Sequence, residues 1–338
     1  MRVTMDDVAR RAGVSRSTVS VVLSGRPGAI SAKTRERVLA AARELGYLPN
    51  RLRRAMQTGR MDALGVVFAN QLRPGVYPGG RASEVLLPAT IGGILAGGAD
   101  AGVSITFFAE HGAAQPSGDA LADRRVDGVL LVAPAPQTDL PRRLAELDVP
   151  CVVALARAGD VWVDADHDFG ARQAARHLLG LGHRRLALLR PREMTAALEL
   201  RREAFCQELR ELGVAKPAAE LALAHGSAAQ GTLAELLGAR QRPTAIFALN
   251  DELAEAALAA AQRAGLAVPE ELSVVGFDDS PLATRVEPRL TTVEVPYFAL
   301  FRRAVGALAA LVREEALAEE QQILPTRLVI RDSTAAVR

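Results

Sequence analysis

The sequence predicts a two-part α/β protein, with a small N-terminal part of three helices and a larger body of parallel βαβ layers. Three short amphipathic segments precede residue 47 and are separated by glycine-containing turns. From residue 62 short apolar runs alternate with amphipathic helical stretches, which is typical of parallel sheets covered by helices. The 338 residues suit two or three domains, and 49% hydrophobic residues suffice for a sizeable core.

Charge divides the chain at the same place. Residues 1–60 contain 13 Lys and Arg against 4 Asp and Glu, a net charge of +9. The remaining residues contain 28 Lys and Arg against 35 Asp and Glu, a net charge of −7. A basic head on a mildly acidic body indicates that the head contacts a polyanion and that the body does not.

Cap residues delimit the three helices of the head. A hydroxyl side chain that can accept a hydrogen bond from the first helical turn precedes each helix, and a glycine follows two of them. The caps are Thr4, Ser15 and Ser31, and the glycines are Gly13 and Gly46. Two short helices joined by a tight glycine turn form a helix-turn-helix, whose second helix enters the major groove of DNA.

The second helix carries the candidate base-reading residues. Arg16, Ser17, Ser20 and Val21 point away from its apolar stripe. Arg16 can bind guanine through two hydrogen bonds, Ser17 can donate or accept one, and Val21 can contact a thymine methyl group. The candidates for phosphate contacts are Thr4, Ser15, Thr18, Ser31, Thr34 and Arg35. The alternative is a generic three-helix bundle with a solvated basic face.

The body is predicted to contain seven strands and at least five helices. The strands are Leu64–Phe68, Val103–Phe108, Gly128–Val132, Cys151–Leu155, Leu186–Leu189, Ala245–Ala248 and Ser273–Gly276. The helices are Ala171–Leu181, Leu198–Leu212, Leu233–Gly238, Leu253–Gly265 and Phe298–Ala318. Neither set repeats at a fixed period, so an α/β core rather than a repeat array is expected.

Both parts resemble the LacI/GalR family of repressors. The string from Thr4 to Ser20 resembles the start of these proteins, and the similarity continues through residues 31–35 and 44–50. Body segments that resemble the family's sensor core are 126–129, 179–187, 243–247, 250–251, 269–279 and 288–293. The resemblance implies a bacterial transcription regulator whose core is similar to type I periplasmic binding proteins, with two Rossmann-like subdomains joined by three crossings.

The resemblance also implies the domain bounds. The helix-turn-helix domain is expected at 1–48, a hinge at 49–60 and the effector-binding core at 61–338. The N-subdomain is expected at about 61–161 and 291–323, and the C-subdomain at about 162–290 and 324–338. A small effector, by default a sugar or related metabolite, would bind in the cleft between the subdomains.

In the family, the hinge folds on DNA into a short helix that enters the minor groove. Asn50, Arg53 and Met56 are the DNA contacts that the resemblance implies here. Met56 stands where relatives have the Leu that wedges into the central base step, and Arg53 replaces a small residue. Relatives often have Arg at the position of Val21, which implies an altered operator. Taken alone, the arginine-rich segment is a basic linker, and a solvated linker is the alternative.

Five residues match the family's effector-contacting pattern. They are Arg201, Asn250, Asp251, Asp278 and, as an aromatic wall, Tyr297. Each has a structural alternative, such as capping a helix or closing a loop. Other positions depart from the pattern: segment 71–87 is rich in Pro and Gly, segment 225–230 lacks an aromatic residue, and Leu155 or Ala156 stands where relatives have Asp. A ligand other than a sugar, or a degenerate pocket, stays open.

No catalytic, metal or cofactor motif is present. Asp164, Asp166 and Asp168 have the spacing of a calcium loop, but Phe169 and Ala175 occupy positions that need Gly and Glu. We therefore expect no enzyme, no metal and no cofactor. Without a signal peptide or an apolar span, a cytoplasmic protein with no membrane partner is expected, and a transporter's solute-binding protein is disfavoured. The expected partners are a near-palindromic double-stranded operator and a second copy in a homodimer, since no leucine-heptad segment supports a tetramer.

Overall fold

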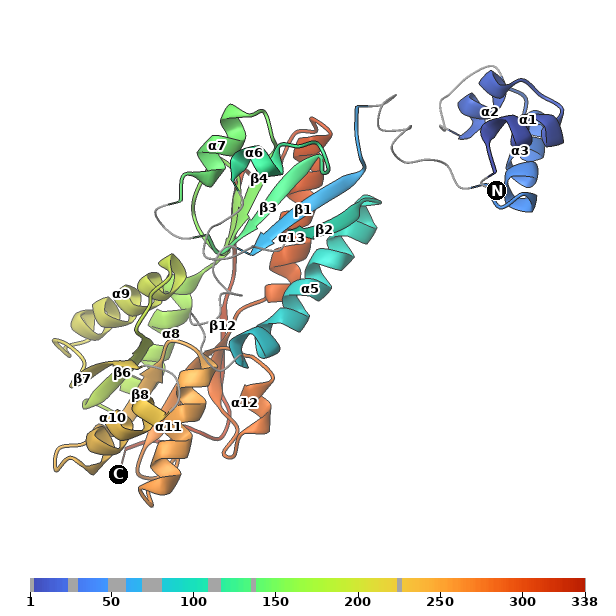
Figure 1. Cartoon of the computed structure of the whole chain (residues 1–338). Helices are drawn as coiled ribbons and strands as arrows, with labels where there is room; N and C mark the ends of the chain where they lie inside the picture. The colour runs from blue at the N-terminus through green and yellow to red at the C-terminus, as the bar shows by residue number, and fades with distance from the viewer. Residues whose placement is uncertain are drawn as a thin grey trace. The chain divides into compact units, whose positions relative to one another are not determined.

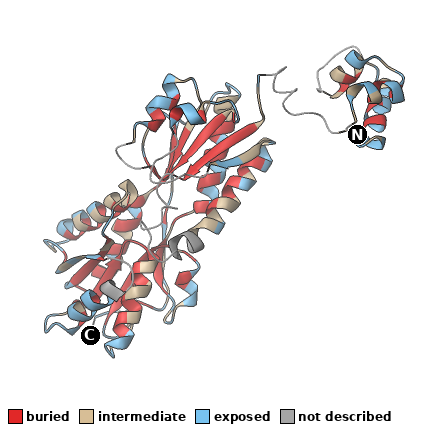
Figure 2. Cartoon of the chain, viewed as in Figure 1, coloured by how far each residue is buried: buried red, intermediate tan, exposed pale blue. Residues whose placement is uncertain are grey.

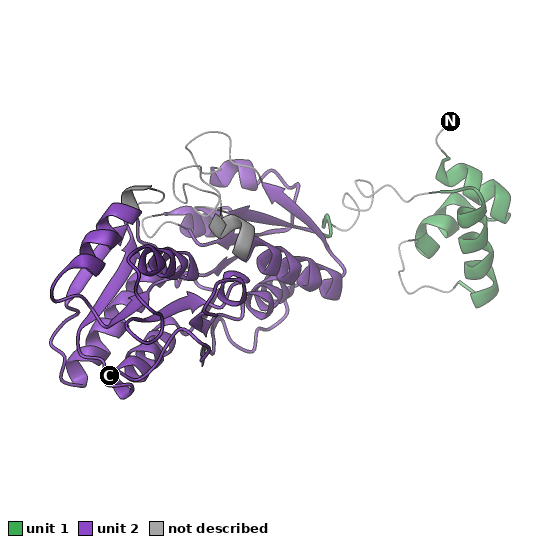
Figure 3. Ribbon diagram, turned by 90° about the horizontal axis from the view of Figure 1, so that it is seen from below, with its two compact units in different colours: residues 1–62 green, residues 63–338 purple. Residues whose placement is uncertain are grey.

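The computed structural model describes residues 3–23, 30–47, 59–68, 81–108, 117–134, 138–223 and 227–337. The chain forms two compact units, Met1–Asp62 and Ala63–Arg338 (Figure 3). Each unit is described by itself below.

The first unit contains the three expected helices, α1 (Met5–Ala12), α2 (Arg16–Leu23) and α3 (Ala32–Glu44). The Thr4 and Ser31 side chains accept hydrogen bonds from backbone N–H groups at the starts of α1 and α3. Gly13 ends α1 with a left-handed φ of 61°, as expected for the turn. The small core consists of buried valines and alanines from all three helices: Val8, Ala9, Ala12, Val19, Val22, Val38, Ala41 and Ala42. The three-helix prediction is confirmed.

The second unit is built on two six-stranded sheets (Figure 1). The first has the order β11-β5-β4-β3-β1-β2 and is parallel throughout. The second has the order β12-β10-β9-β8-β6-β7 and is parallel except for β12. The first sheet's strands are β1 (Ala63–Phe68), β2 (Ser104–Phe108), β3 (Gly128–Val132), β4 (Cys151–Ala154), β5 (Trp162–Ala165) and β11 (Gln321–Leu324). The second sheet's strands are β6 (Leu186–Pro191), β7 (Ala219–Leu223), β8 (Ala245–Ala248), β9 (Ser273–Asp278), β10 (Thr291–Glu294) and β12 (Arg327–Val329).

Helices cover both faces of each sheet (Figure 1). In the first subdomain α5 and α13 pack together on one face, and α6 and α7 lie on the other. In the second, α8 and α9 cover one face, whereas α10 and α11 cover the other and α12 follows β9. Their bounds are α5 (Arg81–Ala101), α6 (Gly118–Leu121), α7 (Leu140–Glu146), α8 (His167–Gly180), α9 (Ala196–Glu211), α10 (Ser227–Gly238), α11 (Asp251–Arg263), α12 (Leu282–Arg285) and α13 (Tyr297–Val312).

The central strands are buried on both faces, which explains their continuous apolar runs, whereas the strands at the sheet edges are partly exposed (Figure 2). Along β6 the side chains alternate: Leu186 and Leu188 join the core under α8 and α9, whereas Ala187 and Leu189 join the core under α10 and α11. All seven predicted strands and five predicted helices are present, so the expected fold class is confirmed. No helix in the described ranges is long and apolar enough to cross a membrane.

The expected subdomain bounds assign two strands to the wrong sheet. β5 was expected with residues 162–290 but pairs with β4 and β11 in the first sheet. β10 was expected with residues 291–323 but pairs with β9 and β12 in the second sheet. The three crossings therefore follow Ala165, Glu294 and Leu324. Strand pairing decides these bounds, and pairing between distant segments leaves no signal in the composition of either strand.

Helix α5 was not predicted, and α13 is shorter than predicted. α5 contains Pro88 and four glycines, residues with low helix propensity. Packing against α13 explains two of the glycines: a Cβ at Gly93 would lie 2.4 Å from the Phe298 carbonyl oxygen, and one at Gly97 2.7 Å from Val305 Cβ. The predicted helix 298–318 ends at Val312, and Glu314 adopts a left-handed φ of 58°.

Candidate nucleic-acid interface and ligand cleft

The N-terminus of α2 presents a cluster of hydroxyl groups. The Ser15 Oγ atom lies 2.7 Å from Ser17 Oγ and 2.9 Å from Thr18 Oγ1, and it accepts a hydrogen bond from the Thr18 N–H at 3.1 Å. Ser15 therefore caps α2 as expected. Ser15 and Ser17 are exposed and Thr18 is half-buried, so these hydroxyls stand where a helix N-terminus can bind a phosphate.

Arg16 is exposed at the first position of α2. Its Nη1 atom lies 3.7 Å from Asp6 Oδ2, with half or more of each side chain exposed. Such surface pairs contribute about 0–1 kcal/mol, so the guanidinium can leave Asp6 for a base edge at little cost. Ser20 and Val21 are half-buried on the same helix. The four candidate base-reading residues thus lie within two turns of one helix.

The phosphate candidates outside α2 flank the starts of α1 and α3. Thr4 and Ser31 are exposed, and Thr34 and Arg35 are half-buried. The Thr4 hydroxyl takes part in a reciprocal capping arrangement with Asp7, whose Oδ2 accepts from the Thr4 N–H at 2.9 Å. Both hydroxyls already cap helices, so a phosphate contact would be an additional role. Asn50, Arg53 and Met56 lie outside the described residues.

Sequence reasoning did not single out Arg37. Its Nη2 atom donates to the carbonyl oxygens of Ala12 at 2.7 Å and Gly13 at 3.3 Å. These are carbonyl groups at the C-terminal end of α1, which a helix leaves without internal partners. Arg37 on α3 therefore holds the turn between α1 and α2. A basic residue on a basic head gives no separate signal in the sequence.

All five candidate effector residues line one cavity of about 50 Å³ in the core. The second subdomain contributes Arg201 from α9, Asn250 and Asp251 from the start of α11, and Asp278 from the end of β9. The first subdomain contributes Tyr297 from α13, together with Leu86, Ala133 and Leu155. The cavity thus lies between the subdomains. The segments 71–80 and 224–226, where departures from the family pattern were noted, lie outside the described residues.

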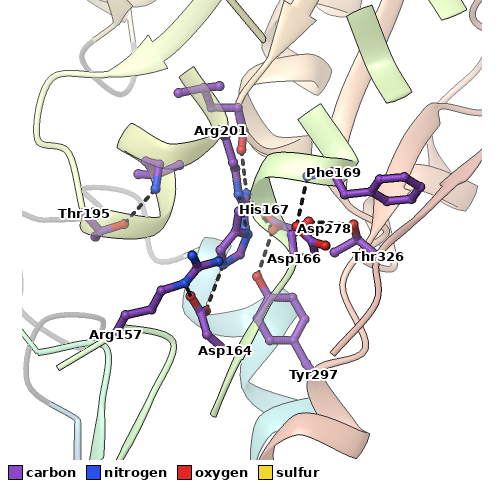
Figure 4. A network of polar contacts seen from close by, with 12 residues as sticks. Arg157, Asp164, Asp166, His167, Phe169, Thr195, Arg201, Asp278, Tyr297 and Thr326 are labelled. Carbon is purple, nitrogen blue, oxygen red and sulfur yellow. Dashed lines mark hydrogen bonds and ion pairs between the residues drawn. The ribbon is translucent and has the colours of Figure 1, made fainter. Parts of the chain in front are cut away.

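Arg201 is buried and engages protein groups on several sides (Figure 4). Its Nη1 atom donates to the Leu249 carbonyl oxygen at 2.7 Å and lies 2.9 Å from Asp278 Oδ1. The same Asp278 oxygen accepts a hydrogen bond from the Tyr297 hydroxyl at 2.8 Å. The guanidinium carbon lies 3.8 Å from the centre of the Phe277 ring. Asp278 therefore joins a cation of one subdomain to a hydroxyl of the other.

Asn250 and Asp251 have the structural roles that the sequence left open. Asn250 caps α11, because its Oδ1 atom accepts from the Leu253 N–H at 2.9 Å. Asp251 accepts from the Ser280 N–H at 2.7 Å and from the Thr292 hydroxyl at 2.6 Å. Burial, together with the charge of Asp278, raises the pKa of Asp251 to about 7. These two residues line the cavity and also fix the loop around it.

Four residues beside the cavity were not predicted as site residues. Arg157, Asp164 and His167 form a hydrogen-bonded chain that ends on Arg201 (Figure 4). Ser280 lines the cavity, and its buried Oγ atom has no hydrogen-bond partner among the described residues. The sequence contains the signal Asp-x-x-His at 164–167, but this spacing is informative only when the end of a strand and the start of the next helix are known.

Comparison with known proteins agrees with both units. The model of the bacterial regulatory proteins of the lacI family matches residues 4–50, and that of a periplasmic binding protein-like domain matches residues 175–334. The HTH-type transcriptional regulator CelR of Thermobifida fusca is 33% identical, over 98% of this chain and 98% of its own.

Two solved structures extend the comparison. The Lac repressor dimer bound to operator and the anti-inducer ONPF superposes with a TM-score of 0.81 and 27% identity, over 99% of this chain and all of that one. A complex of the regulator CelR with cellobiose has a TM-score of 0.71 and 29% identity, over 98% and 100%. A helix-turn-helix unit and a two-sheet sensor core define a DNA-binding transcription regulator. The chain belongs to the LacI family.

Proposed function

We propose that the protein is a dimeric repressor that binds a near-palindromic operator and responds to a small, uncharged, hydroxylated effector, a sugar or related metabolite, in the cleft. We further propose residues 1–48 as the DNA-binding domain, 49–60 as the hinge and the remainder as the effector-binding core. The observation that carries the proposal is the convergence of Arg201, Asp278 and Tyr297, from both subdomains, on one cavity of a chain that also has a helix-turn-helix.

The exposed side of α2 supports sequence-selective DNA binding. Arg16 and Ser17 are exposed at the N-terminal end of the helix, which is the end that contacts base edges in helix-turn-helix proteins. The net charge of +9 on residues 1–60 supplies the attraction to phosphates. A dimer presents two such helices, and its two-fold symmetry is the reason to expect a palindromic operator.

The charges in the cleft support an uncharged effector. Asp278 lies 2.9 Å from Arg201 and already compensates its charge, and the adjacent Asp251 repels anions when it is ionised. Sugar hydroxyls can donate to a carboxylate and accept from a guanidinium at once, so they can join this pair without adding charge. A phosphorylated ligand would bring a second anion to one arginine that is already paired.

The size of the cavity supports an effector-driven conformational change. Its volume of about 50 Å³ is smaller than the roughly 300–1,000 Å³ of typical small-molecule sites. A sugar ring therefore needs more space than this, which movement of the two subdomains or of the lining side chains would provide. A ligand that binds one arrangement better than the other shifts their populations, typically by 1–3 kcal/mol.

Selection of DNA fragments followed by gel shift tests the DNA-binding proposal. Purified full-length protein is incubated with genomic fragments at physiological salt, and retained fragments are sequenced. We expect a shared palindromic site and sequence-selective retardation. Equal retardation of every fragment would contradict a sequence-specific regulator. Sedimentation tests the assembly, for which we expect twice the 35.8 kDa mass of the chain.

Thermal-shift measurements test the effector class. The probes are cellobiose, ribose, galactose and cytidine, with glucose 6-phosphate and ribose 5-phosphate as charged counterparts. An uncharged ligand at 100 times its Kd should stabilise the core by about 2.7 kcal/mol, and D278N should lose the shift. E294Q, at an exposed ion pair away from the cavity, is the matched control. A shift by the phosphorylated probes alone would overturn the uncharged class.

A further inference from the structure

A chain of hydrogen bonds, buried from Asp164 onward, connects the first subdomain to Arg201 (Figure 4). Arg157, between β4 and β5, donates from Nε to Asp164 Oδ2 at 3.2 Å. Asp164 Oδ1, on β5, lies 3.1 Å from Nε2 of His167, the first residue of α8. Arg201 on α9 donates from Nε to His167 Nδ1 at 3.2 Å. Since β5 belongs to the first sheet and α8 and α9 cover the second, His167 connects Asp164 of the first sheet to Arg201 beside the second.

The partners of His167 determine its tautomer. An arginine Nε–H can only donate, so His167 Nδ1 must present its lone pair to Arg201. The single proton of a neutral imidazole is then on Nε2, where it donates to the Asp164 carboxylate. A protonated ring would direct an N–H of Nδ1 at the Arg201 N–H and would break that contact.

The charges around His167 favour this neutral form. Asp164 faces the ring from β5, with Arg157 behind it, Arg201 faces it from α9, and Asp278 lies at the end of β9. Burial and the positive charge of Arg201 lower the pKa of His167, and they outweigh the opposite effects of Asp164 and Asp278. His167 is fully buried, so solvent does not reach the ring.

His167 also completes the orientation of the Arg201 guanidinium. The Nη1 contacts to Leu249 and Asp278 fix one corner of the planar group, and stacking on Phe277 fixes its face. The Nε contact to His167 prevents the guanidinium from rotating within its own plane. The plane and direction of the donor fork are thus set by contacts within the protein, and such preorganisation lowers the entropic cost of binding.

We propose that His167 is a positioning residue, whose Nε2-protonated imidazole orients Arg201 for the effector and couples it to Asp164 across the two subdomains. The consequence for effector binding rests on the proposed function, whereas the connection itself consists of contacts within the protein. The experiments below therefore use ligand-free protein. If the core binds no sugar, the effector proposal is wrong, but the measurements on His167 can still be interpreted.

Nitrogen NMR of the imidazole rings tests the tautomer. In full-length protein labelled at histidine, His167 is assigned by its loss in H167Q. We expect the shift of a lone-pair nitrogen at Nδ1 and of a protonated nitrogen at Nε2, with no titration between pH 8 and 6.5. A protonated Nδ1, or an averaged mixture of tautomers, would overturn the proposal.

Two conservative variants separate the two sides of the connection. In H167N the amide oxygen replaces the Nδ1 acceptor toward Arg201, and in H167Q the amide nitrogen replaces the Nε2 donor toward Asp164. We expect the Arg201 Nε–H to exchange with solvent at least tenfold faster in H167Q than in the wild type, and H167N to restore most of the protection. Equal exchange in all three proteins would show that His167 does not hold Arg201, and equal loss in both variants would contradict the role of the Nδ1 acceptor.

The single tryptophan reports on the far end of the connection. Trp162 lies on β5, and the Arg157 guanidinium carbon is 5.8 Å from its ring. Acidification should protonate His167 and change Trp162 fluorescence with a midpoint below pH 6.5, a transition that H167N and H167Q should both lack. H177Q, at a half-buried histidine bonded to Thr334, is the matched control and should retain it, as should D251N. Persistence of the transition in H167Q would overturn the coupling.

Discussion

The helix-turn-helix surface and the cleft are two candidate binding sites built in opposite ways. On α2, Arg16 and Ser17 are neighbours in the chain, are exposed, and have only weak or local partners. In the cleft, Arg201 and Asp278 are far apart in the chain, are buried, and are paired with each other. The difference teaches that polar groups on an exposed helix can bind a ligand without first breaking strong contacts. Polar groups in a buried site already bond to protein groups, which a ligand must join or replace.

The largest expected effect tests whether the cleft pair holds the fold as well as the ligand. R201A leaves Asp278 buried without its cation and should lower the free energy of unfolding of the core by about 3–5 kcal/mol. R327A, at an exposed pair with Glu294, should cost less than about 1 kcal/mol. Urea denaturation measures both. Equal losses in the two variants would erase the distinction between buried and exposed pairs.

Asp251 provides a pH test of the same buried site. Its pKa of about 7 in the folded state exceeds its ordinary value of 3.8, so between these values the folded protein holds a proton that the unfolded chain has lost. Stability should therefore fall as pH rises from about 4 to 7, by at most about 1.4 kcal/mol per pH unit. D251N cannot titrate, so the difference in unfolding free energy between wild type and D251N should show this slope. A difference that rises with pH would contradict the raised pKa.

Base reading by the head should respond to Arg16. R16A should lose about 1–3 kcal/mol of discrimination at one base pair of the selected operator. R35A, at a phosphate candidate, should instead weaken binding to all sequences and reduce its salt dependence. Fluorescence anisotropy with operator variants at two salt concentrations distinguishes these effects. A uniform loss in R16A would mean that Arg16 contacts phosphate only.

The smallest expected effect concerns the cap of α1. T4A removes the side chain that accepts the Asp7 N–H and should destabilise the head by about 0.5–2 kcal/mol. Hydrogen exchange of the head amides measures this, because the core provides an internal reference in the same sample. Unchanged exchange of the head amides in T4A would contradict the role of the cap, and an equal acceleration in the core would show that the two units do not respond separately.

Local signals account for what the sequence predicted well. Helix periodicity and caps such as Thr4 and Gly13 predicted all three helices of the head. Each cap forms its hydrogen bonds with residues only a few positions away, so the signal is local. Continuous apolar runs placed the central strands, because strands buried on both faces need them. The five cleft candidates rest on the resemblance to the LacI family rather than on a local signal, and all five line the cavity.

Other features depended on partners that are distant in the sequence. The helix at 81–101 contradicts the local propensity of its glycines, which serve the close approach to α13. His167 has no distinctive neighbours in the chain, and its role arises from Asp164 on one side and Arg201 on the other.

The sequence by itself determined a basic three-helix head with a reading helix, an α/β core and the residue types at the cleft. Periodicity, capping and burial act over short stretches of chain, and that is the physical reason. Only the tertiary structure decided which sheet β5 and β10 join, that Arg201 is paired with Asp278, and which tautomer His167 adopts. Strand pairing, charge compensation and hydrogen-bond direction depend on groups that folding brings together from distant segments.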